Sequence, residues 1–253
     1  MLGSETAMKP KPVRPTRSAP KPAAPGPRSE PPKKRVFLVD DHPMMREGMS
    51  RLIDSEPGFT CCGGAKSAEE AINEISRLRP DLVITDITLP QRSGLDLIKD
   101  LAAMQPELPV FVYSMHDEAF YAERALRAGA RGYLMKEAGS ERMLEAIRVV
   151  LAGEISVSPK IAAKLLTLFS GPKSRGSHSP VEKLSDREFD VFQLIGQGKS
   201  TKEIAQLLHL SHKTVAVHRG HIKEKLGLTS SSELVHQAIR WASTPSPQDA
   251  AGG

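Results

Sequence analysis

Five polar side chains stand directly after short apolar runs of this chain, where they could share one reaction site. Asp40 and Asp41 follow the first run, Asp86 the third, Ser114 the fourth and Lys136 the fifth. If these runs are parallel strands, their carboxyl ends meet at one edge of a sheet, so three carboxylates, a hydroxyl and an ammonium group come together. Three close acids repel one another unless a cation lies between them, and carboxylate oxygens suit Mg²⁺.

The carboxylate of Asp86 is a competent nucleophile toward a bound phosphoryl group once a metal ion and an ammonium group neutralise the developing charge. These residue types therefore predict the formation of an acyl phosphate at Asp86. Acids also follow strands simply as turn and N-cap residues, and for any one of the five positions that explanation is equally good. It does not account for all five in this order.

The apolar runs alternate with amphipathic stretches in a way that is typical of an α/β protein. The runs VFLV, FTCC, LVIT, VFVY and GYLM occupy residues 36–39, 59–62, 82–85, 110–113 and 132–135. Each is nearly all apolar, as expected of a parallel strand buried on both faces. Helical periods follow every run, and Ser67 and Glu70 have the spacing of a capping box. The pattern predicts a doubly wound α/β domain with a parallel five-stranded sheet over 34–152.

This region resembles the receiver domains of bacterial response regulators, which have a flavodoxin-like fold. The matching segments are VFLVDDHPMMREG, LVITDITLPQRSGLDLI, VFVYSMHDE and GARGYLMKEAG. The resemblance implies that Asp86 is the phosphoacceptor. It also implies that Asp41 binds Mg²⁺ directly, that Asp40 acts mainly through water, and that the backbone carbonyl of Thr88 completes the protein ligands.

The same resemblance assigns roles to three further residues. Ser114 would hydrogen-bond the phosphoryl group, Lys136 would pair with it, and Tyr133 matches the aromatic switch residue that packs inward when Ser114 moves. Lys136 is followed by Glu137, where many receivers have proline. Thr88 and His116 flank the site at variable positions that are thought to tune dephosphorylation.

After Gly153 the alternation of runs and helical periods stops. Residues 153–183 are expected to be a linker with one helix at 159–169 and a flexible part, GPKSRGSHSPVEK, rich in Gly, Ser and Pro. Three Ser-x-x-Glu helix starts follow, and another helix begins near Ser211. Together they predict an all-α four-helix domain over 184–241.

Residues 184–228 resemble the helix-turn-helix of LuxR-type regulators, with a turn at His209–Ser211. Together with the receiver, they resemble the NarL/FixJ class of response regulators. A generic helical bundle with a basic face is the alternative. The apolar positions expected to close the helical core are Ile204, Leu207, Leu208, Leu210, Val215, Ile222 and Leu226.

One side of the helix that starts near Ser211 is predicted to face DNA. At ~100° per residue, the side opposite the buried positions carries Lys213, Val217, Gly220 and Glu224, with Ala216 at its margin. The family resemblance places Ala216, Val217 and Gly220 in the major groove. Because these residues are small, thymine-methyl contacts and DNA shape must supply much of the specificity. The side chains expected to hold phosphates are Lys213, Thr214, Arg219 and Lys223.

The alternatives for this helix are that its bases form only a solvated face, or that Arg219 swings toward a base edge. His218 and His221 could share a face as zinc ligands, but no cysteine or carboxylate cluster joins them. His218 is expected to point toward the packed side of the helix. Cys61 and Cys62 are adjacent and improbable as a disulfide pair, so they are expected to belong to the second strand, with redox sensing as the alternative.

The charges of the chain are divided unevenly. Residues 1–35 hold nine Lys and Arg against two acids, 36–151 hold thirteen against nineteen, and 152–253 hold thirteen against nine. This indicates that the basic segments meet a polyanion. Residues 1–33 include nine of the twenty prolines and are expected to form a disordered basic tail, with a transit peptide as the alternative. Residues 242–253 are expected to be a second disordered tail.

No apolar stretch approaches the ~18–20 residues that span a bilayer, and no signal-peptide pattern follows the start, so a cytoplasmic protein without a membrane partner is expected. The function predicted is a two-component response regulator, not an enzyme. In this prediction, a sensor histidine kinase phosphorylates Asp86, and this controls homodimer formation and sequence-specific binding to double-stranded DNA, with RNA polymerase as a further expected partner.

Two other functions remain open at this point. An aspartyl-phosphate phosphohydrolase would need a second acid to activate water and a substrate cap, and the receiver region leaves no insertion for either. A protein-interaction adaptor would use the helical domain to dock a partner helix, and its binding would lack the steep salt dependence of DNA binding. No Walker loop is present to support an ATPase.

Overall fold

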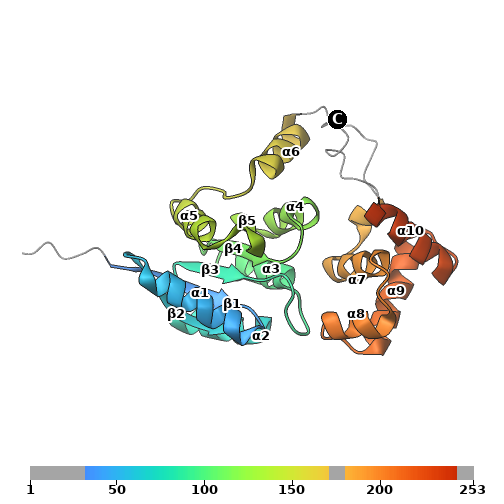
Figure 1. The fold of residues 1–253 in the computed structure, drawn as a ribbon, viewed down its shortest axis with the longest axis horizontal. Helices are drawn as coiled ribbons and strands as arrows, with labels where there is room; N and C mark the ends of the chain where they lie inside the picture. Colours follow the sequence, from blue (N-terminus) through green and yellow to red (C-terminus); the bar gives the residue numbers. More distant parts are fainter. Residues whose placement is uncertain (1–31, 171–179, 244–253) are drawn as a thin grey trace, which may run out of the picture. The chain divides into compact units, whose positions relative to one another are not determined.

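The computed structural model describes residues 32–170 and 180–243. The first of these ranges contains five strands: β1 (Lys34–Val39), β2 (Phe59–Ala65), β3 (Leu82–Thr85), β4 (Val110–Ser114) and β5 (Gly132–Met135). They form one sheet in the order β2-β1-β3-β4-β5, and every pairing is parallel (Figure 1). This is the flavodoxin-like order, so the predicted doubly wound sheet is confirmed.

Helices cover both faces of the sheet because successive strand residues point to opposite sides. Val36 and Leu38 face a core shared with α1 (Pro43–Ser55) and α5 (Ser140–Leu151). Phe37 and Val39 face the other core. The helices on that side are α2 (Ala68–Leu78), α3 (Gly94–Met104) and α4 (Glu118–Ala128).

Two details at the edge of the sheet differ from the sequence prediction. Strand β2 continues past Cys62 through Gly63 and Gly64 to Ala65, where it pairs with β1 across an irregularity in register. At the start of α2, the Ser67 side chain accepts from the Glu70 amide. The Glu70 carboxylate, however, accepts from the amide of Lys66 at 3.0 Å rather than from that of Ser67, so only half of the predicted capping box forms.

The chain returns past β5 before the linking helix α6 (Pro159–Ser170) begins. The amide of Tyr133 donates to the carbonyl of Ser156 at 2.9 Å. A Cβ atom on Gly132 would lie 2.7 Å from that carbonyl oxygen, so the close approach requires glycine. Ser158 then donates to Glu118 of α4 at 2.7 Å, which fixes the start of α6 beside that helix.

The second described range forms the predicted all-α domain. After the short turn of helix η2 (Pro180–Lys183) come four helices, α7 (Asp186–Gly196), α8 (Thr201–Leu207), α9 (His212–Leu226) and α10 (Ser231–Ser243). Capping boxes begin α7 and α8, at Ser185 and Ser200. Among all helices in the described ranges, none is long and apolar enough to cross a membrane.

The core of the helical domain follows the predicted pattern with one exception. Ile204, Leu208, Val215 and Ile222 are buried, whereas Leu207 is 47% exposed. Residues four apart share a helix face, so the inward side of α8 runs from Ile204 to Leu208 and leaves Leu207 outside. Helix α10 continues to Ser243, two residues beyond the predicted end of the domain at 241. The rest of the two predicted tails, residues 1–31 and 244–253, and the middle of the predicted linker, residues 171–179, lie outside the described residues.

Candidate functional site: an acidic pocket and a helix-turn-helix

Asp86 stands immediately after β3, and the backbone around it is closely packed. The amide of Gly94 donates to the carbonyl of Ile87 at 2.7 Å. A Cβ atom at Gly94 would lie 1.9 Å from the carbonyl oxygen of Asp86, which no other residue could accommodate without moving the backbone. The start of α3 is thereby held against the residue that carries the carboxylate.

The Asp86 carboxylate is surrounded by hydrogen-bond donors and is only 6% exposed. Its Oδ1 atom accepts from the Ser114 hydroxyl at 2.6 Å and from the Ile87 amide at 2.6 Å. Its Oδ2 atom accepts from the ammonium group of Lys136 at 2.6 Å. The structure thus brings together the predicted acid, hydroxyl and ammonium groups from the ends of three strands.

Lys136 also joins Asp86 to the acidic pair after β1, because its Nζ atom lies 2.6 Å from Oδ2 of Asp40. Burial lowers the pKa of Lys136, but the charges of Asp86 and Asp40 outweigh it, and the pKa ends above its usual value. The ammonium group therefore stays charged and holds the two buried carboxylates together.

Asp41 completes the acidic cluster, and its environment fits a hard cation. Its Oδ1 atom is buried and has no hydrogen-bond donor, although Nδ1 of His42 lies 2.8 Å away. One oxygen of Asp40, one of Asp41 and one nitrogen of His42 all lie within 4.8 Å of one another. Closely spaced carboxylate oxygens are the ligands that Mg²⁺ prefers. Sequence reasoning did not find the position of His42 beside the acids.

Thr88, His116 and Tyr133 lie around the rim of this pocket. The Thr88 hydroxyl lies 2.7 Å from Nε2 of His116. The Tyr133 hydroxyl donates to the carbonyl of His116 at 2.8 Å, and its ring is buried. Burial, followed by the charge of Asp86, raises the pKa of Tyr133, so this hydroxyl remains a donor. The ring of Tyr133, the predicted switch residue, is thus packed inside the receiver.

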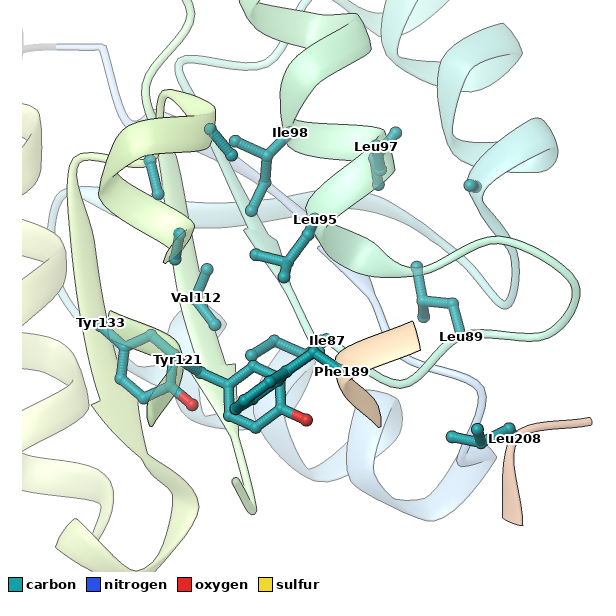
Figure 2. Packing of buried hydrophobic residues seen from close by; sticks show 14 of the residues in the cluster. Ile87, Leu89, Leu95, Leu97, Ile98, Val112, Tyr121, Tyr133, Phe189 and Leu208 are labelled. Carbon is teal, nitrogen blue, oxygen red and sulfur yellow. The ribbon is translucent and has the colours of Figure 1, made fainter. Parts of the chain in front are cut away.

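Helix α4 connects this rim to helix α7 of the helical domain. The ring of Tyr121 lies 4.6 Å from that of His116 and 5.4 Å from that of Phe189 in α7. Figure 2 shows the side chains of Tyr121 and Phe189 next to each other. Arg124, in the next turn of α4, donates to Asp186 at 3.1 Å. Sequence reasoning missed these contacts, because neither residue type nor spacing marks a pair so far apart in the chain.

The outer face of α9 is exposed. Four of the residues predicted to face DNA are exposed here: Lys213, Ala216, Val217 and Gly220. The side chain of Val217 is 48% exposed. Thr214 is half-buried and its amide donates to the Ser211 hydroxyl that caps the helix. The other two predicted phosphate contacts, Arg219 and Lys223, are half-buried.

His218 points toward the packed side of α9, as predicted. It is half-buried, and its Nδ1 atom is buried without a hydrogen-bond partner. Burial, and then the nearby charge of Arg187, lowers the pKa of its imidazole, which favours the neutral form. Within the described ranges, the one cluster of potential metal ligands is the acidic pocket, which does not include His218 or His221.

A phosphoacceptor-like pocket at the edge of a parallel sheet, joined to a helix-turn-helix, defines the class of DNA-binding response regulators. Comparison with family models agrees with this. Residues 36–148 match the response regulator receiver domain, and residues 182–238 match the luxR family of bacterial regulatory proteins. The chain belongs to the LuxR-type response regulators, and it is a two-component regulator of transcription rather than an enzyme.

Curated relatives span nearly the same architecture. The chain is 36% identical to the response regulator GacA of Pseudomonas aeruginosa over 206 residues, which cover 81% of this chain and 95% of GacA. It is 32% identical to the oxygen regulatory protein NreC of Staphylococcus carnosus over 210 residues, which cover 81% of this chain and 97% of NreC.

Two solved structures are similar. A LuxR-family response regulator from Aurantimonas sp. SI85-9A1 is 33% identical with a TM-score of 0.51, and the match covers 55% of this chain and 99% of that one. The RcsB response regulator of Salmonella typhimurium, at 23% identity and a TM-score of 0.57, shares the fold over 83% of this chain and 98% of its own.

Proposed function

We propose that Asp86 accepts a phosphoryl group from a partner histidine kinase and that the phosphorylated chain binds double-stranded DNA as a homodimer. The observation that carries this proposal is the buried Asp86 carboxylate, bonded at 2.6 Å to both Ser114 and Lys136. Both groups now donate to the carboxylate, and both can donate to the oxygens of a phosphoryl group once it is attached there. Because the chain is a bacterial transcription regulator, we place this reaction in the cytoplasm.

The transfer exchanges one bond to phosphorus for another. A carboxylate oxygen of Asp86 attacks the phosphorus of a phosphohistidine as the P–N bond breaks, and the imidazole leaves with the bonding electron pair and takes up one proton from solvent. The Ile87 amide, which donates to Oδ1 at 2.6 Å, orients the carboxylate for this attack. Lys136 and Ser114 then hydrogen-bond the phosphoryl oxygens, as positioned donors that need no rearrangement of solvent.

The same pocket is proposed to hold one Mg²⁺ ion. Asp41, Asp86, Asp40 and the backbone carbonyl of Thr88 are the groups that would bind it, Asp40 mainly through water. The buried Asp41 oxygen without a donor supports this assignment. When bound, the ion would supply positive charge that offsets the negative charge of the phosphoryl oxygens.

The exposed face of α9 is the proposed DNA-reading surface. Ala216, Val217 and Gly220 would enter the major groove, where small side chains permit contact with thymine methyl groups. Lys213, Thr214, Arg219 and Lys223 would hold phosphates on either side of that groove. RNA polymerase remains a proposed further partner of the bound dimer.

Intact-mass measurement after incubation with Mg²⁺ and acetyl phosphate tests the phosphoacceptor. The wild-type chain should gain one phosphoryl group, and Asp86→Asn, which keeps the shape but removes the nucleophile, should gain none. Asp100→Asn, which alters a partly exposed carboxylate of α3 paired with Arg92, is the matched control and should label fully. Undiminished labelling of Asp86→Asn would overturn the assignment.

A further inference from the structure

A histidine of the helix-turn-helix contacts the acidic pocket. Nε2 of His209 lies 3.1 Å from Oδ2 of Asp41, the other oxygen of the carboxylate whose Oδ1 has no donor. His209 occupies the turn between α8 and α9, and its φ of 52° is in the left-handed region that few residues other than glycine and asparagine adopt readily. In this conformation the turn presents its imidazole to the pocket.

The turn is held against the receiver by more than this histidine. The guanidinium of Arg187 in α7 donates to the carbonyl of Leu89, in the loop after β3, at 3.4 Å. The same guanidinium nitrogen donates to the carbonyl of Leu208, next to His209, at 3.2 Å. The Leu89 and Leu208 side chains are both buried, and both are labelled at the right of Figure 2. His209 thus reaches Asp41 from a packed contact.

We propose that His209 and the divalent cation compete for Asp41, so that docking of the α8–α9 turn and loading of the cation site oppose each other. The argument rests on the cation site of the proposed function. The His209 imidazole, with Nε2 3.1 Å from Oδ2 of Asp41, occupies the space beside the oxygens that a cation needs. A bound cation and its water ligands would meet that imidazole at close range, so the two cannot occupy the same side of the carboxylate at low cost.

Competition for one carboxylate makes the coupling reciprocal. If docking of the turn weakens Mg²⁺ binding by some factor, Mg²⁺ must weaken docking by the same factor. A single polar contact between partly exposed groups sets this factor at about 2- to 10-fold. Because the turn leads directly into α9, the helix proposed to read DNA, filling the cation site would loosen the helix-turn-helix before any phosphoryl group arrives.

The first measurement is the Mg²⁺ affinity of the full-length protein, by calorimetric titration without a phosphodonor. His209→Asn is the informative variant, because asparagine tolerates the left-handed backbone but its amide is too short to reach Asp41. We expect it to bind Mg²⁺ about 2- to 10-fold more tightly than the wild type. His212→Asn, at an exposed position at the start of α9, is the matched control and should bind like the wild type.

A second readout separates docking from a simple loss of nearby charge. Trp241 is the single tryptophan of the chain, and its ring lies 4.8 Å from that of Phe120 in α4. Its emission should shift as Mg²⁺ is added to the wild type, with the same midpoint as the calorimetric titration. Without Mg²⁺, the Trp241 emission of His209→Asn should lie between that of the cation-free wild type and that of the Mg²⁺-saturated wild type. An unchanged starting emission would overturn the competition even if the affinity rose.

One more variant separates this inference from the proposed cation site. Asp41→Asn should weaken Mg²⁺ binding strongly if the ion uses this carboxylate. If Mg²⁺ binds Asp41→Asn and the wild type equally, the proposed cation site fails and the competition fails with it. If Asp41→Asn loses Mg²⁺ but His209→Asn binds no more tightly than His212→Asn, the cation site stands and the competition alone is overturned.

Discussion

The Tyr121 hydroxyl of α4 lies 2.7 Å from Oδ1 of Asp190, a buried carboxylate in α7. Burial, and then the charge of Asp190, raises the pKa of Tyr121 far above its usual value, so the hydroxyl keeps its proton and can donate it. The ring of Tyr121 also packs on His116, whose carbonyl accepts from the hydroxyl of Tyr133. One side chain therefore touches both the rim of the acidic pocket and the first helix of the DNA-binding domain.

Tyr121→Phe should loosen the contact between α4 and α7 while preserving its packing. The variant leaves the Asp190 carboxylate buried with one donor fewer, which costs about 1–3 kcal/mol. Urea unfolding followed by the emission of Trp241 measures this loss. Tyr113→Phe removes a hydroxyl that donates to the carbonyl of Lys136 at 3.2 Å, within the receiver, and serves as the control. If both variants lost the same free energy of unfolding, the Tyr121 hydroxyl would contribute no more to stability than a hydroxyl within the receiver.

Gly94→Ala should damage both the receiver fold and phosphorylation of Asp86. Its Cβ atom would lie 1.9 Å from the Asp86 carbonyl oxygen, so the backbone at the pocket must move. Overpacking of this kind costs about 1–3 kcal/mol or more. Gly48→Ala is the matched control, because a Cβ atom in that turn of α1 meets nothing within 4 Å. It should instead stabilise the chain by up to about 1 kcal/mol through helix propensity.

Thermal unfolding of the two variants, together with acetyl phosphate labelling, checks this pair. Opposite signs for the two changes in stability are the expected result. A loss of stability in Gly48→Ala as large as that in Gly94→Ala would mean that added volume at glycine, rather than the approach to Asp86, governs the effect.

Much of the receiver could be predicted from its sequence, because buried parallel strands are short apolar runs and their ends carry the chemistry. The run at 82–85 matches β3 to the residue. The order of Asp86, Ser114 and Lys136 after successive runs was enough to place them together. In the helical domain, the Ser-x-x-Glu spacing at Ser185 and Ser200 predicted the starts of α7 and α8, where capping boxes form. All of these signals are local.

What could not be predicted depends on contacts between distant segments. Gly63 and Gly64 disfavour strands by propensity, and only pairing with β1 extends β2 through them. Nothing near His209 in the sequence indicates that it lies 3.1 Å from Asp41. The same holds for Tyr121 and Asp190, whose meeting requires two folded domains to dock.

Glu188 should make the stability of the helical domain depend on pH. Burial raises the pKa of this carboxyl, but Lys225 at 2.6 Å and the capping bonds with Ser185 outweigh it and leave the pKa below its ordinary value of 4.5. A lowered pKa stabilises the fold above that value, and the contribution disappears as the pH falls through the folded-state pKa. Glu188→Gln should therefore cost about 1–2 kcal/mol at neutral pH and progressively less in acid.

Thermal unfolding of Glu188→Gln and the wild type from pH 7 down to pH 3 tests this. The difference between the two should shrink below the ordinary pKa of 4.5. Glu224→Gln, on the exposed side of α9, is the control and should track the wild type throughout. A difference for Glu188→Gln that stays constant across the range would mean that shape, rather than charge, explains the loss.

Val217 and Lys223 should affect DNA binding in different ways. Val217 is 48% exposed on the outer face of α9, where its methyl groups can meet thymine. Val217→Ala removes two carbon atoms from the apolar side chain. It should change the ratio of affinities for two operators by roughly 3- to 10-fold. Lys223→Ala should weaken binding to every sequence and lower the slope of affinity against salt by about 0.9, the effect of one phosphate contact.

Titrations of both variants with specific and scrambled duplexes at several salt concentrations separate the two effects. A phosphate contact acts on any duplex, because the backbone charge is the same in every sequence, whereas a methyl contact exists only where thymine stands at the right position. Lys223→Ala should therefore lose the same factor on both duplexes, and Val217→Ala should lose more on the specific one. If Lys223→Ala changed sequence preference and Val217→Ala did not, the proposed orientation of α9 in the groove would be wrong.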